Sequence, residues 1–389
     1  MRPPLALYVH MPWCVRKCPY CDFNSHPLKG SRPDAGYIDA LLADAAREAP
    51  LVEGRRIETI FFGGGTPSLF TPADFQRLLQ GLRAFIDIAA DAEITMEANP
   101  GAVERGAFAG YAAAGINRVS LGAQSFSAAA LQRLGRIHAP EDTDRAVSEL
   151  RAAGLRNFNL DLMYALPEQR VEEALADLRH ALQLGPSHLS HYQLTLEPGT
   201  AFAARPPTLP AEDESFAMQC ESLSLLAGAG FEQYEVSAHA RGGARCRHNL
   251  NYWRFGDYLG IGAGAHGKLT LEDRASGETH ILRTAKPRQP REYLREALAM
   301  GEGSDQPFGE RRVVPSPELP FEFMLNVLRL PAGFSEAEFE SGTGLPVERI
   351  TAPLARAEAR GLLRRVGQGW QPTTLGMRFL NDLQAEFLS

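Results

Sequence analysis

Three cysteines near the N-terminus are the residues best suited to chemistry. Cys14, Cys18 and Cys21 form a Cys-x3-Cys-x2-Cys segment, and the whole chain has 5 cysteines. Thiolates bind soft metals and iron–sulfur clusters, and an odd number of thiols in a chain of this length favours metal ligation in a reducing compartment over a disulfide scaffold. Three thiols leave a four-coordinate site one ligand short. His10 or His26 would complete a structural zinc site, whereas an open iron would take an outside ligand.

A glycine-rich turn is the second candidate. Phe61-Phe62-Gly63-Gly64-Gly65-Thr66-Pro67 follows an expected strand. Glycines allow the backbone to approach a ligand closely, although a lone turn of this kind is also an ordinary β–α connection. The cysteine segment follows the preceding strand, so the pairing favours a ligand site.

Alternating strands and helices must position these residues. The C-terminal ends of the expected strands carry polar residues or glycines, which is typical of a barrel site. The pattern predicts strands at Leu5–Met11, Ile57–Phe62, Glu93–Ala98, Asn117–Ala123, Asn157–Met163 and His188–Leu196, and helices at Tyr37–Glu48, Pro72–Ile86, Val103–Ala114, Glu141–Ala153 and Val171–Leu184.

The later part of the chain has a different pattern. We expect a linker at Ala204–Pro210, a helix at Glu212–Ala227, a strand near Phe231–Val236 and a second linker at Gly301–Pro317. From Glu318 the order is helix, helix, a hairpin at Leu362–Gln371 and a last helix, which resembles a winged helix.

Composition limits the classes of protein. The chain has 389 residues and a formal net charge of −7, which argues against a duplex nucleic-acid binder. We expect no secretory signal at the N-terminus, and no run of 18 apolar residues occurs in the sequence. We therefore expect a cytoplasmic protein without a transmembrane segment, which leaves peripheral membrane association open.

The Cys-x3-Cys-x2-Cys loop and the Gly-Gly-Thr-Pro turn together resemble the signature pair of the radical S-adenosylmethionine (SAM) superfamily. The resemblance implies that Cys14, Cys18 and Cys21 hold a 4Fe-4S cluster with SAM on the fourth iron. An electron from the cluster then cleaves SAM to methionine and a 5′-deoxyadenosyl radical. It also implies an α/β fold, a partial (β/α)6 TIM-like barrel of the radical SAM type with additional strands and a C-terminal, mostly helical, winged-helix-like domain.

Further motifs resemble the HemN/HemW branch, which holds oxygen-independent coproporphyrinogen III oxidases and heme-binding relatives. They are Tyr8-Val9-His10-Met11-Pro12-Trp13, Cys18-Pro19-Tyr20-Cys21-Asp22-Phe23-Asn24-Ser25-His26, Glu97-Ala98-Asn99-Pro100, Ser120-Leu121-Gly122-Ala123-Gln124-Ser125, Gly135-Arg136 and Asn159-Leu160-Asp161-Leu162-Met163-Tyr164-Ala165-Leu166-Pro167. The resemblance implies a core at residues 1–200, a barrel extension at 201–300 and a C-terminal domain at 318–389.

The resemblance also implies a set of SAM contacts. Glu97 would hold the ribose hydroxyls, as suits a carboxylate acceptor. Singly, Glu97 could instead pair with an Arg, Arg136 could be a surface cation and Asp161 could cap a turn. The full implied set is Tyr8, Tyr20, Gly64, Gly65, Thr66, Glu97, Gln124, Arg136 and Asp161.

Two features favour HemW, a heme chaperone, over the oxidases. The oxidases have a further cysteine two residues past the third ligand, where this chain has Phe23. The run His248-Asn249-Leu250-Asn251-Tyr252-Trp253 is similar to the His-Asn-x-x-Tyr-Trp motif of HemW. Its imidazole and aromatic rings, from His248, Asn249, Tyr252 and Trp253, could contact heme, and the basic stretch Arg283–Arg295 could bind its propionates. Alternatively, the motif locks the C-terminal part onto the barrel, and the basic stretch is a solvated face.

Three hypotheses follow for function. The first is a chaperone that binds heme, receives electrons from a flavodoxin-type protein and passes heme to acceptor proteins. The second is a coproporphyrinogen III oxidase, against which Phe23 counts. The third is a nucleic-acid binder using residues 318–389, but seven Arg against nine acidic residues there argue against it.

Overall fold

Parallel strands form the middle of one large sheet in the computed structural model, which describes residues 2–30, 35–101, 107–272, 277, 279–299 and 308–388. The sheet has 12 strands within these residues, in the order β14-β13-β12-β11-β1-β4-β5-β6-β7-β8-β10-β9. Every pair from β11 to β8 is parallel, whereas the outer pairs are antiparallel. The strands are β1 Leu5–Met11, β2 Trp13–Cys14, β3 His26–Pro27, β4 Arg56–Gly64, β5 Asp87–Ala98, β6 Arg118–Gln124, β7 Phe158–Tyr164, β8 His188–Gln193, β9 Glu232–Gln233, β10 Ala238–Ala240, β11 Asp257–Ile261, β12 His266–Glu272, β13 Thr279–Ala285, β14 Glu310–Val313, β15 Phe334–Ser335, β16 Leu363–Val366 and β17 Gly369–Pro372.

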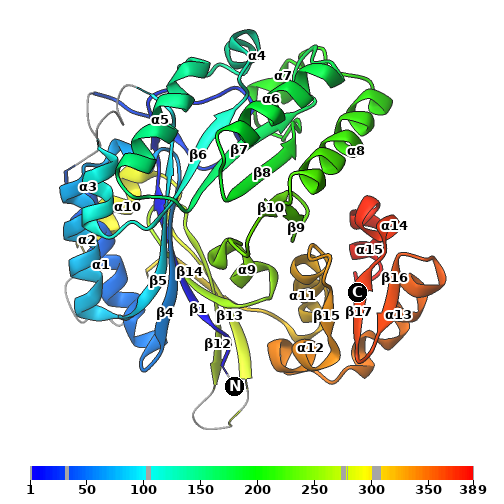
Figure 1. The fold of residues 1–389 in the computed structure, drawn as a ribbon. Coiled ribbons are helices and arrows are strands. Elements are labelled where there is room, and N and C mark those ends of the chain that lie inside the picture. The colour runs from blue at the N-terminus through cyan, green and yellow to red at the C-terminus, as the bar shows by residue number, and fades with distance from the viewer. Residues whose placement is uncertain are drawn as a thin grey trace.

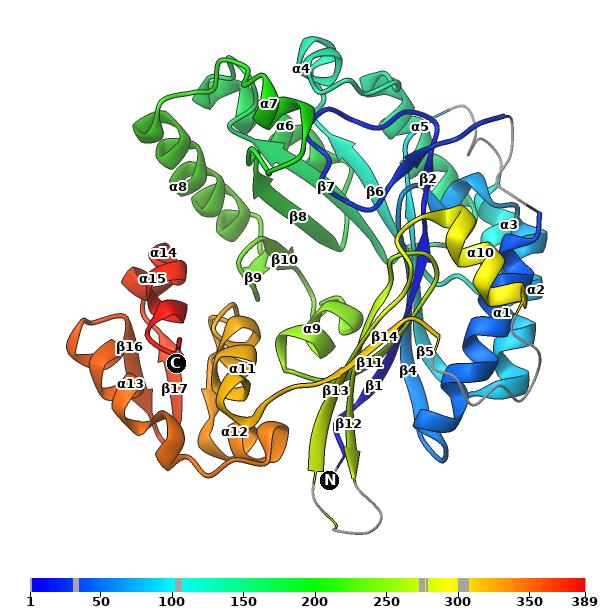
Figure 2. The same ribbon diagram turned by 180° about the vertical axis from the view of Figure 1, so that it is seen from behind.

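Helices cover the outer face of the curved sheet, so the fold is a partial (β/α)6 barrel (Figures 1 and 2). The α-helices are α1 Tyr37–Glu48, α2 Pro72–Phe85, α3 Phe108–Ala114, α4 Ala128–Arg133, α5 Pro140–Ala152, α6 Val171–Gln183, α7 Ala201–Ala204, α8 Glu212–Gly228, α9 Arg247–Trp253, α10 Pro290–Ala299, α11 Leu319–Val327, α12 Glu336–Thr343, α13 Glu348–Ala359, α14 Thr374–Arg378 and α15 Leu380–Ala385. Short 3-10 helices are η1 Ala49–Val52, η2 Pro67–Leu69 and η3 Ser316–Glu318.

Local sequence signals explain where several helices begin and end. The Thr71 hydroxyl caps α2, and the Asp74 carboxylate returns a hydrogen bond to the Thr71 backbone N–H. Pro72 occupies the first helical position, where its missing N–H costs nothing. Gly115 closes α3 at a φ of 111°, a conformation that L side chains disfavour. These ends agree with the sequence pattern. Residues 103–106 of the expected Val103–Ala114 helix lie outside the described residues, and α3 is described from Phe108.

The second half of the chain departs from expectation. The expected strand Phe231–Val236 is only β9, two residues long, because the chain turns there and re-enters the sheet as β10. Part of the expected linker 301–317 is strand β14, while residues 301–307 lie outside the described ones. Strand β11 extends the parallel sheet beside β1, which the glycine-rich sequence did not suggest. The expected hairpin near the C-terminus is formed by β16 and β17.

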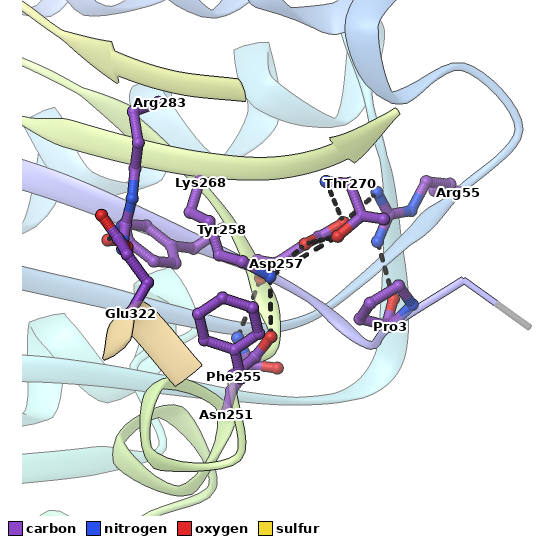
Figure 3. Close-up of polar contacts among 10 residues, drawn as sticks. All are labelled: Pro3, Arg55, Asn251, Phe255, Asp257, Tyr258, Lys268, Thr270, Arg283 and Glu322. Carbon is purple, nitrogen blue, oxygen red and sulfur yellow. Dashed lines mark hydrogen bonds and ion pairs between the residues drawn. The ribbon is translucent and has the colours of Figure 1, made fainter. Parts of the chain in front are cut away.

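A buried carboxylate ties the barrel extension to the core (Figure 3). Asp257 is fully buried and accepts hydrogen bonds from Arg55 Nη1 (2.8 Å), Lys268 Nζ (3.0 Å) and the Thr270 hydroxyl (2.8 Å). Lys268 Nζ also donates to the Phe255 carbonyl at 2.7 Å. Burial lowers the pKa of Lys268 to about 8, and the Asp257 charge opposes that shift. The Asp257 carboxylate therefore balances the charges of Arg55 and Lys268 where β11, β12 and the start of β4 meet.

Phe255 links this hydrogen-bond network to the C-terminal region, because its carbonyl accepts from Lys268 and its ring lies in the C-terminal core. It belongs to the C-terminal apolar core, where its ring packs against Phe323 with centroids 5.4 Å apart. Arg283 on β13 pairs with Glu322 on α11 across the same boundary. The C-terminal helices are thus fastened to the barrel by shared apolar burial and by charge.

We predict that Asp257→Asn lowers the free energy of unfolding by about 3–5 kcal/mol, because it leaves Lys268 and Arg55 buried with too little compensating charge. Asp87→Asn is the matched control, since the Arg56–Asp87 side chains are 65% and 60% exposed, and it should cost less than about 1 kcal/mol. Urea unfolding followed by circular dichroism measures both. Equal effects of the two substitutions would contradict this account.

Candidate functional site

The three cysteines meet the glycine turn at the carboxyl ends of β1 and β4. Cys14, Cys18 and Cys21 are half-buried and line one cavity of about 310 Å³. Gly65 N–H donates to the Met11 carbonyl, and Thr66 N–H donates to the Trp13 carbonyl, both at 2.7 Å. A Cβ on Gly65 would lie 2.5 Å from the Trp13 carbonyl oxygen, so only glycine fits this approach.

The geometry disfavours the single-zinc alternative. Among the described residues, no three His, Cys, Asp or Glu side chains converge on the position of one metal ion. His10 Nε2 donates to the Asn24 carbonyl (2.9 Å), and its Nδ1 accepts from the Tyr8 hydroxyl (3.0 Å). His10 and His26 are both absent from the described lining of the cysteine cavity. Thiols spaced around a cavity suit a multi-iron cluster, in which each thiolate binds a different iron.

Burial raises the pKa of Cys14 and of Cys21 above the ordinary thiol value. Hydrogen bonding opposes the shift, from Thr66 at Cys14 and from Ser25 at Cys21, where the Sγ–Oγ distance is 3.7 Å. Because iron binds the thiolate, loading of the site must release protons. Burial therefore favours the protonated form of the Cys14 and Cys21 thiols.

Polar side chains from successive strand ends form the opposite wall. Glu97 is the next-to-last residue of β5 and accepts a hydrogen bond from Gly64 N–H at 3.1 Å. Asp161 on β7 accepts from the Ser120 hydroxyl (3.0 Å) and from Asn159 (2.8 Å). Gln124 at the end of β6 accepts from the Tyr192 hydroxyl at 2.8 Å. All of these except Asn159 line the cavity.

Two carboxyl groups thus face one cavity. Burial, reinforced by the charge of Asp161, raises the pKa of Glu97 to about 8. Burial also raises the pKa of Asp161, against the hydrogen bonds of Asn159 and Ser120. No ion pair joins Glu97 to an arginine in the described chain, and Asp161 bonds neighbouring strands instead of capping a turn. The wall is ready to accept hydroxyl or ammonium donors of a ligand.

Arg136 is anchored beside the cluster segment and is not a free surface cation. Its Nη2 donates to the Gly122 carbonyl (2.8 Å) and to Asn99 Oδ1, and its Nη1 lies 3.8 Å from Cys18 Sγ. Asn99 in turn donates to the Thr66 hydroxyl at 3.0 Å. This chain of contacts places one positive charge against the thiols.

The cavity brings together most residues of the expected SAM set. Tyr20, Gly64, Gly65, Thr66, Glu97, Gln124, Arg136 and Asp161 all line it. Tyr8 is not among its described lining residues; its ring stacks on Phe61, with centroids 6.4 Å apart, and its hydroxyl bonds His10. Asn99, Ser120 and Tyr192 also line the cavity. Asn99 and Ser120 stand in motifs that resemble the HemN/HemW branch, whereas Tyr192 has no sequence signal beyond its place near the end of β8.

The His-Asn-x-x-Tyr-Trp motif lies elsewhere, on α9 inside the barrel. His248 is 1% exposed, and its Nδ1 is hydrogen-bonded with the Thr59 hydroxyl at 2.9 Å. Glu93 on β5 accepts from the backbone N–H groups of Arg247 (3.2 Å) and His248 (3.1 Å). A strand carboxylate therefore caps this short helix and holds it against the sheet.

The aromatic end of the motif contacts the C-terminal region. The Tyr252 ring packs on Tyr258 with centroids 4.3 Å apart, and the Arg329 guanidinium lies 4.3 Å from the Trp253 ring. Arg329 also pairs with Glu235 at 3.0 Å. Asn249 is half-buried on the same helix. This geometry favours the locking interpretation of the motif over a heme contact.

The basic stretch 283–295 is divided between buried and exposed positions. Lys286 is fully buried and pairs with Asp44 and Glu48, each at 2.8 Å, while Arg283 pairs with Glu322. These two cations are therefore committed to the fold. Arg288 and Arg291 are exposed and remain available to a ligand.

Comparison with known proteins assigns the family. A family model described as the radical SAM superfamily matches residues 8–181, and one described as the HemN C-terminal domain matches residues 314–379. The chain is 50% identical over 387 residues to the Escherichia coli protein named heme chaperone HemW, covering 100% of this chain and 99% of that relative. The chain belongs to the HemW family of radical SAM proteins.

Other relatives agree with this assignment. The Haemophilus influenzae protein named heme chaperone HemW is 47% identical over 391 residues, covering 100% of this chain and 98% of its own length. The solved structure of coproporphyrinogen III oxidase (HemN) from Escherichia coli has a TM-score of 0.82 at 23% identity, with 100% of this chain and 91% of that chain covered. That likeness shows a shared fold. No helix in the described part of the HemW-family chain is long and apolar enough to cross a bilayer.

Membership of the radical SAM superfamily implies a 4Fe-4S cluster and SAM. The cavity fits both groups. It offers three thiols as soft ligands on one side, and a close-packed glycine turn and a carboxylate-bearing wall on the other.

We predict that Glu97→Gln stabilises the cluster-free protein at pH 8 by about 1–2 kcal/mol. With a folded pKa of about 8 against an ordinary value of 4.5, the folded chain keeps a proton that the unfolded chain loses as pH rises. Between pH 4.5 and about pH 8, Glu97 is ionised in the unfolded chain and protonated in the folded chain, and this difference favours unfolding. The gain should vanish near pH 4.5 in urea titrations. Glu58→Gln, on an exposed position of β4, serves as the control. A loss of stability at both pH values would contradict the assignment.

Proposed function

We propose that this chain is a heme chaperone, which binds a 4Fe-4S cluster, SAM and heme and transfers heme to acceptor proteins. The observation that carries the proposal is the 50% identity, along the full length of both chains, to a protein named heme chaperone HemW. The cavity with its three thiols and carboxylate wall supports the two cofactors.

In this proposal Cys14, Cys18 and Cys21 ligate the cluster. When bound, the cluster and SAM supply one-electron chemistry that amino acid side chains lack. Arg136 lies against Cys18 and offsets the negative charge that thiolates bring. The turn Gly64–Thr66 and the carboxylate of Glu97 receive the polar parts of SAM, and Gln124 and Asp161 complete the wall.

The other proposed roles follow the division of the chain. Residues 1–200 form the cofactor-binding core, residues 201–300 extend the barrel, and residues 318–389 form the C-terminal domain. In this proposal His248 holds α9 against the sheet, and Trp253, beside Arg329, fastens the C-terminal domain. We place the protein in the cytoplasm, with a flavodoxin-type electron donor and without a nucleic-acid partner.

Coproporphyrinogen III oxidation is the alternative function, and Phe23 argues against it. Where the oxidases have a further cysteine, this side chain lines the mouth of the cavity and is 60% exposed. A phenyl ring cannot ligate metal or transfer a proton, so any step that uses the additional thiol is lost.

We expect the anaerobically reconstituted protein to bind hemin near one equivalent and to leave coproporphyrinogen III unchanged. Replacing Cys14, Cys18 and Cys21 together by Ala should abolish bound iron and sulfide, because the remaining ligands cannot hold a cluster. Cys220→Ala is the control, since Cys220 is exposed on α8 and should leave iron content intact. Formation of protoporphyrinogen would overturn the chaperone assignment.

The proposed ribose contact gives a separate prediction. Above pH 8, where Glu97 is ionised, Glu97→Gln should weaken SAM binding about tenfold, because a neutral amide accepts hydroxyl donors less strongly than a carboxylate. Equilibrium dialysis with the reconstituted protein measures the affinity, and iron content confirms that the cluster is intact. Unchanged affinity would remove Glu97 from the SAM site.

A further inference from the structure

A second cavity, of about 390 Å³, lies behind the cysteine segment. Strand β2 and helix α10, both labelled in Figure 2, contribute to its walls. Its lining combines an indole, an imidazole, two cations and several apolar side chains. These residues are Trp13, His26, Pro27, Leu28, Lys29, Gln289, Pro290, Arg291 and Leu294.

This cavity is adjacent to the cluster site but is separate from it. Trp13 and Cys14 are successive residues of β2, and successive side chains of a strand point to opposite faces. Cys14 lines the cysteine cavity, whereas Trp13 lines the second one. Strand β3 pairs with β2, so that Trp13 is opposite His26. One short strand thus separates the two cavities.

Trp13 offers a fixed aromatic surface. Its ring meets Tyr37 edge-on, with centroids 4.7 Å apart and an interplanar angle of 77°, and it is also packed on Phe70. The indole remains half-buried where it lines the cavity. Together with Leu28 and Leu294, it suits a flat apolar ligand.

His26 is oriented for metal binding. Its Nε2–H donates to Asn24 Oδ1 at 3.3 Å, and the Arg288 carbonyl lies close to the same ring. The Asn24 amide nitrogen donates to the carbonyls of Ala263 and Arg288, both at 2.9 Å, which fixes the acceptor. The contacts with Asn24 Oδ1 and the Arg288 carbonyl anchor the ring, and Nδ1 is the nitrogen that a ligand would take. A histidine held through one nitrogen presents the other as a ligand.

Two cations at the cavity have no carboxylate partner in the described chain. Lys29 and Arg291 are both exposed, and neither forms an ion pair with the described residues. Arg295, one turn further along α10, is by contrast close to Glu296 at 3.2 Å. Free cations beside an apolar wall suit a ligand that carries carboxylates on a hydrophobic body.

We propose that this second cavity binds the heme cargo, with Trp13 against the macrocycle, His26 Nδ1 on the iron, and Lys29 and Arg291 on the two propionates. The proposal rests on the proposed chaperone function and adds where heme binds. It places heme on the reverse face of the strand that carries Cys14, and away from His248. An apolar anion without iron could pair with Lys29 and Arg291 and pack on Trp13, but it would offer no metal for His26 to bind.

The test uses the full-length reconstituted protein and hemin as the probe. Arg291→Glu should weaken hemin binding about tenfold through the lost propionate contact, while Arg295→Glu on the same helix should leave affinity unchanged. With hemin dimethyl ester, whose carboxylates are blocked, the Arg291→Glu penalty should disappear. His26→Ala should remove the Soret band of histidine-ligated heme, whereas His266→Ala should preserve it.

The outcomes separate the two proposals. If the wild-type protein binds no hemin, the chaperone function itself fails. If it binds hemin and the Arg291→Glu and His26→Ala variants match their controls, the function stands and this site is wrong. Iron-free protoporphyrin IX bound as tightly as hemin, with no response to His26→Ala, would show an anion site without iron ligation and would overturn the heme assignment. Cluster iron content and circular dichroism confirm that each variant is folded.

Discussion

Two backbone hydrogen bonds position the rest of the site. Gly65 and Thr66 donate to the carbonyls of Met11 and Trp13, and so join the glycine turn to the cysteine segment. The contact extends the β1–β4 ladder beyond its last paired residues, and no side chain fits at position 65. Because of it, the three thiols face the carboxyl ends of the strands. The cavity, its carboxylate wall and the short strand β2 all depend on this close backbone approach.

The site holds two buried carboxyl groups without an ion-pair partner among the described residues. Glu97 and Asp161 share a wall, and burial raises both pKa values, while Arg136 supplies a cation near Cys18. Burying these groups without full compensation lowers the stability of the free protein. A ligand with matching hydrogen-bond donors recovers that free energy when it binds. Asp161 is held by the neutral partners Ser120 and Asn159 and not by an ion pair, so its carboxyl group remains available to a ligand.

Several charged groups outside the cavity have a structural role. Asp257 compensates two buried cations, Lys286 pairs with two acids, and Glu93 caps α9. The same helix holds Trp253 beneath Arg329, so the barrel and the C-terminal helices share one packed boundary. Lys29 and Arg291 are exceptions, since they line a cavity without a carboxylate partner in the described residues, and we place the heme propionates there.

The sequence by itself determined the alternation of strands and helices and the winged-helix-like order near the C-terminus, which follow from local periodicity and capping residues that act over a few residues. The cysteine segment followed from its spacing, and most other residues of the cysteine cavity were implied by the resemblance to radical SAM proteins. Only the tertiary structure decided that Lys286 and His248 are buried, that β11 joins the parallel sheet, and that Trp13 and Arg291 line one cavity. Burial and long-range pairing depend on segments hundreds of residues apart, and a polar residue type gives no local sign of the partner that will enclose it.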